Sequence, residues 1–299
     1  MPSFFDTCCY NMFCMKALYL CSNKTGIKKS EKKINFIFDS LRKIYEDLTI
    51  VKTENIEDFE ENIRKSVGIF DVVIVGGGDG TLKAAVTVLM EFSKEVRPVL
   101  GYLPLGTVND AGKAVGINGS LKKAFKILEK NSVVEVDVCK VNNEYFNFVC
   151  AAGAYSDISY VTKRKAKKFF GKFAYYFVAI ASLFKKKKLT VHVEADDKII
   201  DIKTPLVLIM NSKNVGGFPV NFNYSVVDGK VEIYLTKPGL FNGLLHYLFF
   251  KMRTIKLKAS HVKVSIVSNE TWCLDGEKGF DGDVEITVIK QELRMIGKL

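Results

Sequence analysis

Residues 73–82 read VIVGGGDGTL, so an apolar run leads directly into four glycines and one aspartate. The apolar run is typical of a buried strand, and the residues after Thr81 have the pattern of a helix. Glycine disfavours helices and strand interiors, so a cluster of glycines indicates a turn that needs bare backbone. A strand that enters a helix through such a turn points backbone N–H groups outward at the positive end of the helix dipole, where phosphate groups bind.

The same residues also fit a plain strand-to-helix turn in a parallel sheet. They match neither the GxxxxGKS/T pattern of a P-loop nor the GxGxxG spacing of dinucleotide-binding turns. Asp79 would repel a phosphate group unless a cation or a hydrogen bond offset its charge. The glycines by themselves leave the phosphate site and the plain turn both open.

Strands and helices alternate on both sides of this turn. We expect strands at residues 16–21, 48–51, 72–75 and 98–103, and helices at residues 37–44, after Thr53 and at residues 82–92. This alternation predicts a Rossmann-like α/β domain, residues 15–134, whose parallel sheet is covered on both faces.

Beyond residue 134 the pattern changes to short, often alternating apolar segments. They lie at residues 136–141, 189–194, 206–210, 230–235, 262–267 and 284–289. We expect residues 135–299 to form a mainly antiparallel β-sandwich domain, whose last strand could return to the first domain. A ligand shared by two such domains binds by default in the interdomain cleft.

The net charge of +11 favours anionic partners, and one segment accounts for most of it. Residues 163–188 hold ten basic side chains and no acidic one. They flank an apolar run, residues 173–184, which is too short to cross a bilayer and suits a core helix or a helix at a membrane surface. No nucleic-acid-binding motif accompanies them, so we expect no nucleic-acid partner.

The seven cysteines are irregularly spaced and do not form a disulfide framework, which favours a reducing cytoplasm. Residues 1–14 lack the basic start of a signal peptide. We expect them to be a disordered extension ahead of the first strand.

Two further loops carry polar residues that could face the same ligand. LPLGTVND, residues 103–110, follows the next expected strand, and loops after parallel strands open at the same carboxyl edge. Asn109 and Asp110 could also simply cap the helix that follows. WCLDGE, residues 272–277, adds Asp275 and Glu277 from the second domain.

GGDGT at residues 77–81, PLGTVND at 104–110 and DGE at 275–277 occur in an order and spacing that resemble the bacterial diacylglycerol kinase-like lipid kinases. The similarity covers nearly the whole chain from Met15. GGDGT alone also occurs in NAD kinases and phosphofructokinases, whereas the three motifs together are specific. NKTG at residues 23–26 and GAYSDISY at 153–160 are also similar to segments of that family.

The resemblance implies ATP and Mg²⁺ as cofactors and a lipid hydroxyl, by default that of diacylglycerol, as the phosphoryl acceptor. It implies Glu277 as the general base, with Asp275 and Asp79 on the Mg²⁺ side of the site. The residues that it implies for the nucleotide are Asn23, Thr25, Thr53, Gly77, Gly78, Asp79, Gly80, Thr81, Leu82, Lys83, Gly106, Thr107, Asn109 and Asp110.

The resemblance also implies a structural Mg²⁺ in the second domain, where the family has two adjacent aspartates before a glycine. The corresponding segment here is SVVDGK, residues 225–230, in which Val227 replaces the first aspartate. Asp228 and the backbone carbonyls of Ser225 and Lys230 are the remaining candidate ligands. Lys24 similarly replaces the usual proline of the first turn.

Three functions stay open at this point. A lipid kinase is favoured by PLGTVND, DGE and the basic segment, which suits peripheral contact with an anionic membrane from the cytoplasmic side. The alternatives are an NAD kinase-like or other soluble-substrate kinase and a non-catalytic protein that binds anionic membranes. The presence of Asp79, Asp110, Asp275 and Glu277 disfavours the last. The sequence leaves open whether the chain forms a homodimer.

The basic segment predicts salt-sensitive membrane binding, because each lysine near an anionic surface contributes about 1 kcal/mol and the effect fades within a Debye length. The protein should sediment with vesicles that contain phosphatidylglycerol or cardiolipin, and about 0.5 M salt should release it. Replacing Lys185, Lys186, Lys187 and Lys188 by Gln should weaken sedimentation but not ATP binding. Equal binding to neutral vesicles would contradict this interpretation.

Overall fold

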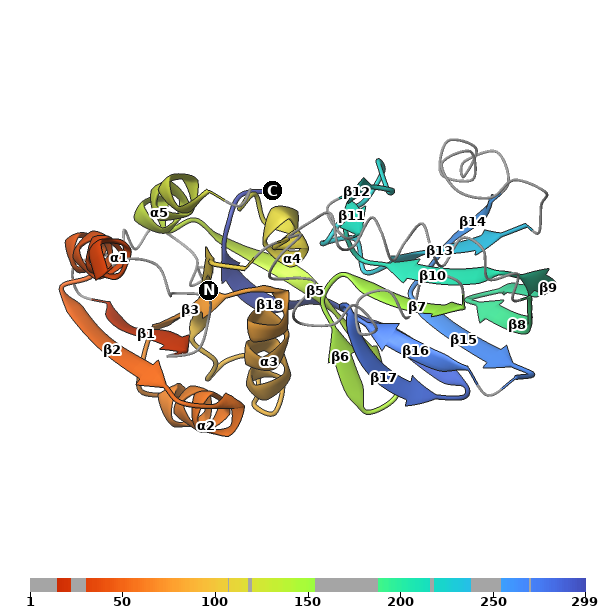
Figure 1. The fold of residues 1–299 in the computed structure, drawn as a ribbon, viewed down its shortest axis with the longest axis horizontal. Helices are drawn as coiled ribbons and strands as arrows, with labels where there is room; N and C mark the ends of the chain where they lie inside the picture. Colours follow the sequence, from red (N-terminus) through yellow and green to blue (C-terminus); the bar gives the residue numbers. More distant parts are fainter. Residues whose placement is uncertain are drawn as a thin grey trace, which may run out of the picture.

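The computed structural model describes residues 15–22, 31–106, 108–117, 120–153, 188–215, 218–237, 254–268 and 270–299. An α/β half precedes a β-rich half along the chain, and the two lie end to end (Figure 1). Residues 1–14, the NKTG segment and nearly all of the basic segment lie outside the described residues. Among the described helices, none is long and apolar enough to cross a membrane.

The α/β half is built on four parallel strands in the order β2, β1, β3 and β4. Helices α1 and α5 lie together on one face of this sheet, and α2 and α3 on the other (Figure 1). The elements are β1 (Lys16–Ser22), α1 (Glu31–Ile44), β2 (Asp47–Thr53), α2 (Ile56–Ser66), β3 (Val72–Gly77), α3 (Asp79–Leu89), β4 (Val99–Pro104), α4 (Asp110–Ala114) and α5 (Leu121–Lys130).

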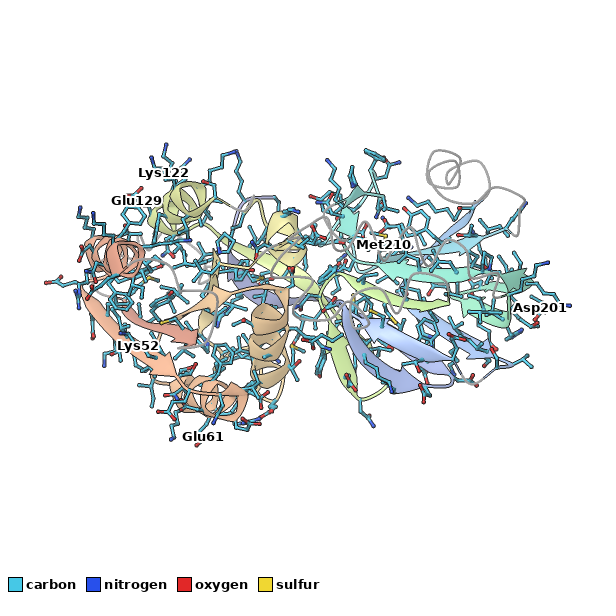
Figure 2. All side chains as sticks on the ribbon, viewed as in Figure 1. Lys52, Glu61, Lys122, Glu129, Asp201 and Met210 are labelled. Atoms are coloured by element: carbon cyan, nitrogen blue, oxygen red, sulfur yellow. The ribbon has the colours of Figure 1, made fainter. Side chains whose placement is uncertain are left out.

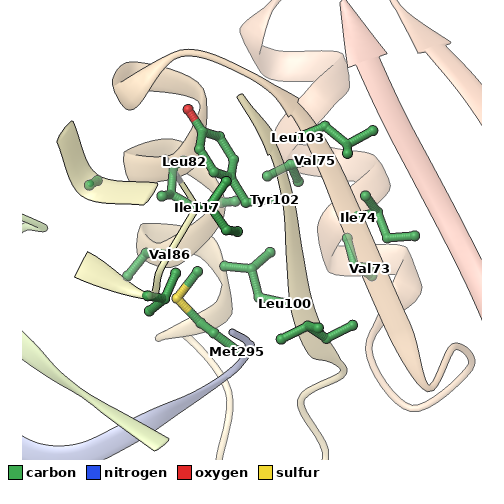
Figure 3. Packing of buried hydrophobic residues seen from close by; sticks show 14 of the residues in the cluster. Val73, Ile74, Val75, Leu82, Val86, Leu100, Tyr102, Leu103, Ile117 and Met295 are labelled. Atoms are coloured by element: carbon green, nitrogen blue, oxygen red, sulfur yellow. The ribbon is translucent and has the colours of Figure 1, made fainter. Parts of the chain in front are cut away.

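Local sequence explains the central elements of this half. Every residue of β3 is buried, as expected for an inner strand of a parallel sheet. Asn55 caps helix α2, because its side chain accepts a hydrogen bond from the backbone N–H of Asp58 at 2.7 Å. The helix buries Phe59 and Ile63 on the face that points to the sheet. Apolar side chains of β3, β4 and α3 pack together around Leu100 and Tyr102 (Figure 3).

The β-rich half consists of two packed sheets with a separate apolar core between them. One sheet has six strands in the order β14, β13, β10, β7, β16 and β17, and all its pairings are antiparallel. The elements are β5 (Val133–Val141), β6 (Glu144–Phe146), β7 (Val149–Gly153), β8 (Leu189–Ala195), β9 (Lys198–Thr204), β10 (Leu206–Met210), β11 (Asn214–Val215), β12 (Phe218–Pro219), β13 (Val231–Thr236), β14 (Thr254–Ala259), β15 (His261–Ile266), β16 (Thr271–Leu274), β17 (Glu277–Asp281) and β18 (Val284–Ile296).

The long strand β18 connects the halves. It pairs with β15 near its start and runs antiparallel to β5, and near its end Met295 pairs in parallel with Leu100 of β4 (Figures 1 and 3). The four parallel strands are therefore part of one ten-stranded sheet that continues into the second half. The boundary expected at residues 134 and 135 falls inside β5, so the chain crosses it as a strand.

Buried side chains also continue from one half to the other. Strands β7 and β10 are buried along their whole length, with alternate residues in the core between the two sheets and in the core of the α/β half. Met210 belongs to the core of the α/β half and lies near the middle of the molecule, whereas Asp201 lies at the outer end of the β-rich half (Figure 2). This continuity limits independent movement of the halves.

The predicted fold class is confirmed: a parallel-sheet α/β half is followed by a mostly antiparallel β-sandwich. Helix α3 begins at Asp79, three residues earlier than expected, because its first turn includes the glycine motif itself. Strands β6, β7, β9, β11, β12, β14, β16 and β17 and helix α5 were not expected. Several of these strands are short, and strands β7 and β16 carry buried residues in succession rather than in alternation, which conceals the period of two.

Arg97 links β18 to the α/β half through contacts with Glu292. Arg97→Met should therefore lower the free energy of unfolding by about 2–4 kcal/mol. Its nearly buried guanidinium donates to the carbonyl oxygens of Phe92 at 2.8 Å and Glu292 at 3.1 Å, and it pairs with the Glu292 carboxylate at 3.0 Å. Urea unfolding measures the change. Arg42→Met is the control, because Arg42 is exposed and its pair with Asp39 spans 4.0 Å, and it should change stability by less than about 0.5 kcal/mol.

Candidate functional site

The carbonyl oxygen of Gly77, at the end of β3, joins the two glycine-containing loops of the α/β half. It accepts hydrogen bonds from the backbone N–H groups of Leu105 at 2.8 Å and Gly106 at 3.0 Å, and it lies 3.1 Å from the hydroxyl of Tyr102. The loops after β3 and β4 therefore form one unit at the carboxyl edge of the sheet, where the sequence analysis expected them to meet.

Asn109 completes this unit from the second loop. Its backbone has a positive φ of 54°, a conformation that asparagine tolerates better than most residues. Its side-chain amide donates to the carbonyl of Gly106 at 3.0 Å and its Oδ1 lies 3.0 Å from the Tyr102 hydroxyl. Burial raises the pKa of Tyr102, so the phenol keeps its proton and acts as a donor.

Asp79 links the glycine motif to helix α4. Its Oδ1 accepts a hydrogen bond from the backbone N–H of Ala111 at 2.9 Å, near the N-terminus of that helix. Burial raises the pKa of Asp79, and the backbone hydrogen bonds partly offset this effect. The Asp79 charge is therefore partly committed to holding the second loop, which is the hydrogen-bonding role that the sequence analysis left open beside a cation.

Gly77 and Gly106 have no room for a side chain, because protein atoms rather than ligand atoms lie close to them. A Cβ at Gly77 would collide with the side chain of Thr81, and one at Gly106 would lie 2.5 Å from the Cα of Gly78. Gly78 and Gly80 are different, since the nearest atoms to an added Cβ would be the Cα of Gly106 at 3.4 Å and the Oε1 of Glu277 at 3.1 Å.

Helix α3 presents unpaired donors beside Gly80. Leu82 makes the first hydrogen bond of the helix, to the carbonyl of Gly78 at 3.1 Å. The backbone N–H groups of Asp79, Gly80 and Thr81 precede it and have no acceptor within the described part of the chain. Three such donors at the positive end of a helix suit an anionic ligand such as a phosphate group.

Glu277 faces this helix end from the other half of the molecule. It is the first residue of β17 and its side chain is exposed, while its Oε1 lies next to Gly80. The turn that places it passes through Asp275 and Gly276, both with positive φ. The structure thus brings the GGDGT and DGE motifs together, although nearly 200 residues separate them in the sequence.

Asp275 is buried beneath that turn and holds it in place. Its carboxylate accepts hydrogen bonds from the backbone N–H groups of Asn147 at 2.6 Å, Phe148 at 2.9 Å and Val149 at 3.0 Å. Burial raises the pKa of Asp275 to about 6, while the backbone donors and the positive charge of Lys83 act in the opposite direction. These contacts make Asp275 the residue that positions Glu277.

Lys83 extends from the second turn of α3 towards the second half. Its ammonium lies 4.0 Å from the carboxylate of Glu144 on β6, and only 15% of its side chain is exposed. A lysine one turn inside a helix end is suitably placed to add positive charge beside an anion that binds there.

Of the other residues expected to bind the nucleotide, some are buried in the protein and some lie outside the described residues. Leu82 is buried in the core, and Thr53 is fully buried with its hydroxyl 3.5 Å from the carbonyl of Cys21. Asp110 is buried and pairs with Lys113 at 2.6 Å. Asn23, Thr25 and Thr107 lie outside the described residues.

The segment expected to hold the structural Mg²⁺ has contacts that do not fit that ion. Asp228 pairs with Lys258 Nζ at 2.5 Å through Oδ2 and accepts from the backbone N–H of Lys230 at 3.1 Å through Oδ1. Val227 packs against the apolar core of the α/β half. Mg²⁺ requires a near-octahedral set of oxygens, which an ammonium group and an isopropyl group do not supply.

Tyr102 and Lys258 are the structurally important residues that the sequence analysis missed. Tyr102 lay within an expected strand, and nothing in the sequence distinguishes it from a core aromatic residue. Lys258 lies on β14, whose alternating sequence TIKLKA at residues 254–259 was the available but overlooked signal.

Comparisons with known proteins agree on one family. Residues 16–141 match the family model of the diacylglycerol kinase catalytic domain. A diacylglycerol kinase of Staphylococcus epidermidis is 30% identical over 219 residues, which cover 70% of this chain and 69% of the relative. One of Staphylococcus carnosus is 29% identical over 235 residues, which cover 76% of each chain. The crystal structure of a diacylglycerol kinase from Bacillus anthracis superposes with a TM-score of 0.79 at 24% identity, over 95% of this chain and 97% of that one.

The glycines of the motif should respond differently to alanine. Gly77→Ala should lower the melting temperature strongly, because its methyl group would collide with Thr81. Gly80→Ala should fold normally and raise the KM for ATP, because its methyl group would lie beside the helix N–H donors and Glu277. Thermal unfolding and steady-state kinetics separate these effects. An unchanged KM for Gly80→Ala would mean that the helix end does not bind the nucleotide.

Proposed function

The chain belongs to the diacylglycerol kinase family and is a kinase, and from this premise we propose that it transfers the γ-phosphoryl group of ATP to the hydroxyl group of diacylglycerol. The observation that supports this most directly is the approach of Glu277 to Gly80. An exposed carboxylate from one half lies beside a helix end of the other, where three N–H donors have no acceptor among the described residues, and phosphoryl transfer needs a base and a phosphate site paired in this way.

In this proposal the N–H groups of Asp79, Gly80 and Thr81 bind phosphate oxygens of ATP, and Lys83 adds positive charge from the next turn. Phosphoryl transfer depends mainly on holding the reacting groups in line and on stabilising the charge on the transferred group. The hydrogen bonds centred on Gly77 fix this helix end before the nucleotide arrives.

Mg²⁺ accompanies ATP in this proposal. The described residues hold no cluster of three acidic, histidine or cysteine side chains that would bind a metal by themselves. Where Mg²⁺ accompanies a nucleotide, it usually binds to phosphates and water with one or two protein carboxylates. Asp79 would be such a carboxylate, because its two oxygens offer about four acceptor positions and the backbone N–H groups of Asn109, Asp110 and Ala111 use at most three. When bound, the ion neutralises phosphate charge.

Glu277 acts as the general base that accepts the proton of the lipid hydroxyl. A carboxylate is suitable because its oxygens can accept the hydroxyl proton directly. Asp275 keeps the turn in place through its three backbone donors, so it acts on the reaction only through the position of Glu277.

In this proposal the kinase binds its lipid substrate at an anionic membrane surface. Lys188, the one described residue of the basic segment, is exposed immediately before β8. Diacylglycerol cannot diffuse freely to a site in water, so the kinase must reach the membrane, and a basic segment supplies attraction without a spanning helix.

Glu277→Gln should keep the fold and ATP binding while it lowers kcat by roughly 10²- to 10⁴-fold, the usual effect of removing a general base. The assay measures phosphorylation of diacylglycerol in mixed vesicles. Glu144→Gln is the matched control, because Glu144 is also an exposed carboxylate near α3 but faces Lys83 rather than Gly80. Turnover of Glu277→Gln close to that of the control would remove Glu277 from the mechanism.

A further inference from the structure

A buried carboxylate and a lysine face each other across strands β13 and β14. Glu232 and Lys258 are directly opposite in the antiparallel register, and Lys258 Nζ lies 3.2 Å from Glu232 Oε1. Only 1% of the Glu232 side chain is exposed. A carboxylate buried to this degree needs a compensating positive charge, because the low-dielectric interior disfavours an isolated ion.

The same ammonium group also binds the loop before β13. Lys258 Nζ lies 2.5 Å from Asp228 Oδ2, so it bridges one carboxylate on the strand and one on the loop. Asn221 completes the cluster by donating to Glu232 Oε2 at 2.7 Å, and Lys256 donates to the Asn221 oxygen at 3.3 Å. The cluster thus contains two carboxylates and two ammonium groups.

The loop itself is tied to the strand that joins the halves. The N–H of Gly229 donates to Asp137 Oδ2 on β5 at 2.7 Å, and the N–H of Gln291 on β18 donates to Asp137 Oδ1 at 2.8 Å. The loop carbonyl of Val226 accepts from the N–H of Asp137 at 2.7 Å. Asp137 therefore links this loop to both β5 and β18. The Asp228 carboxylate lies in the same loop, and the Lys258 ammonium balances its charge.

We propose that the ammonium group of Lys258 takes the place of a divalent cation in this loop, so that its structure does not depend on Mg²⁺. Three features carry the proposal: the bridge from Lys258 to Asp228 and Glu232, the use of the other Asp228 oxygen by the N–H of Lys230, and the packing of Val227 into the apolar core. An ammonium at this distance repels a divalent cation, so the two alternatives exclude each other.

The first test compares the melting temperature of the nucleotide-free protein in EDTA and in millimolar Mg²⁺ at matched ionic strength. The wild type and Asp228→Asn should each melt at the same temperature in both buffers, within about 1 °C. Stabilisation of the wild type by Mg²⁺ that is lost in Asp228→Asn would overturn the proposal. This measurement involves no nucleotide, so it is independent of the Mg²⁺ that accompanies ATP.

The second test removes the ammonium group. Lys258→Met should lower the melting temperature by roughly 5–10 °C, because it leaves Glu232 buried without its cation. Lys263→Met is the matched control, since the exposed Lys263 forms an exposed pair with Glu285 at 3.5 Å, and its melting temperature should not change. A Lys258→Met protein as stable as the control would also overturn the proposal. If Lys258→Met does not fold, the comparison in EDTA and Mg²⁺ decides.

Discussion

The carbonyl oxygen of Gly77 is the point on which the site depends. It accepts from two backbone N–H groups of the neighbouring loop and lies within hydrogen-bonding distance of Tyr102, so the ends of β3 and β4 cannot separate without breaking several contacts. The close approach of Gly78 and Gly106 is possible because Gly106 has no side chain. The glycines of the motif therefore serve two purposes: some bring the loops together, and others leave the helix end open to an anion.

The second constraint is the route of the chain through β5 and β18. Because β18 pairs with β15 in one half and with β4 in the other, the site cannot be assembled by two independently placed domains. Asp275 anchors the turn before Glu277 to the backbone between β6 and β7. The distance from Glu277 to Gly80 is thus set by a continuous sheet and by buried hydrogen bonds. This arrangement brings together the proposed base and the proposed phosphate site, which come from distant parts of the sequence.

Much of this arrangement could be predicted from the sequence, and the missing parts have physical reasons. Strand and helix periodicity predicted the parallel sheet. Because loops after neighbouring parallel strands open at the same edge of a sheet, the sequence also predicted that residues 103–110 lie beside the glycine motif. The family resemblance implied Glu277 as the general base, but its contact with Gly80 was not predicted, because no local pattern encodes a pairing between such distant residues. The structural role of Gly77 could not be predicted, since it depends on how closely Thr81 approaches Gly77 in the folded turn. Lys258 was missed because its partner Glu232 is fixed by strand register, which sequence alone specifies poorly.

The central claim is that these parts form a lipid kinase rather than a kinase of a soluble substrate. The most direct measurement incubates the pure protein with γ-labelled ATP, Mg²⁺ and a mixture that contains both vesicle-borne diacylglycerol and NAD, and then identifies the labelled product by mass. The account predicts label in phosphatidic acid, in the organic phase. Label confined to a water-soluble product such as NADP would contradict it.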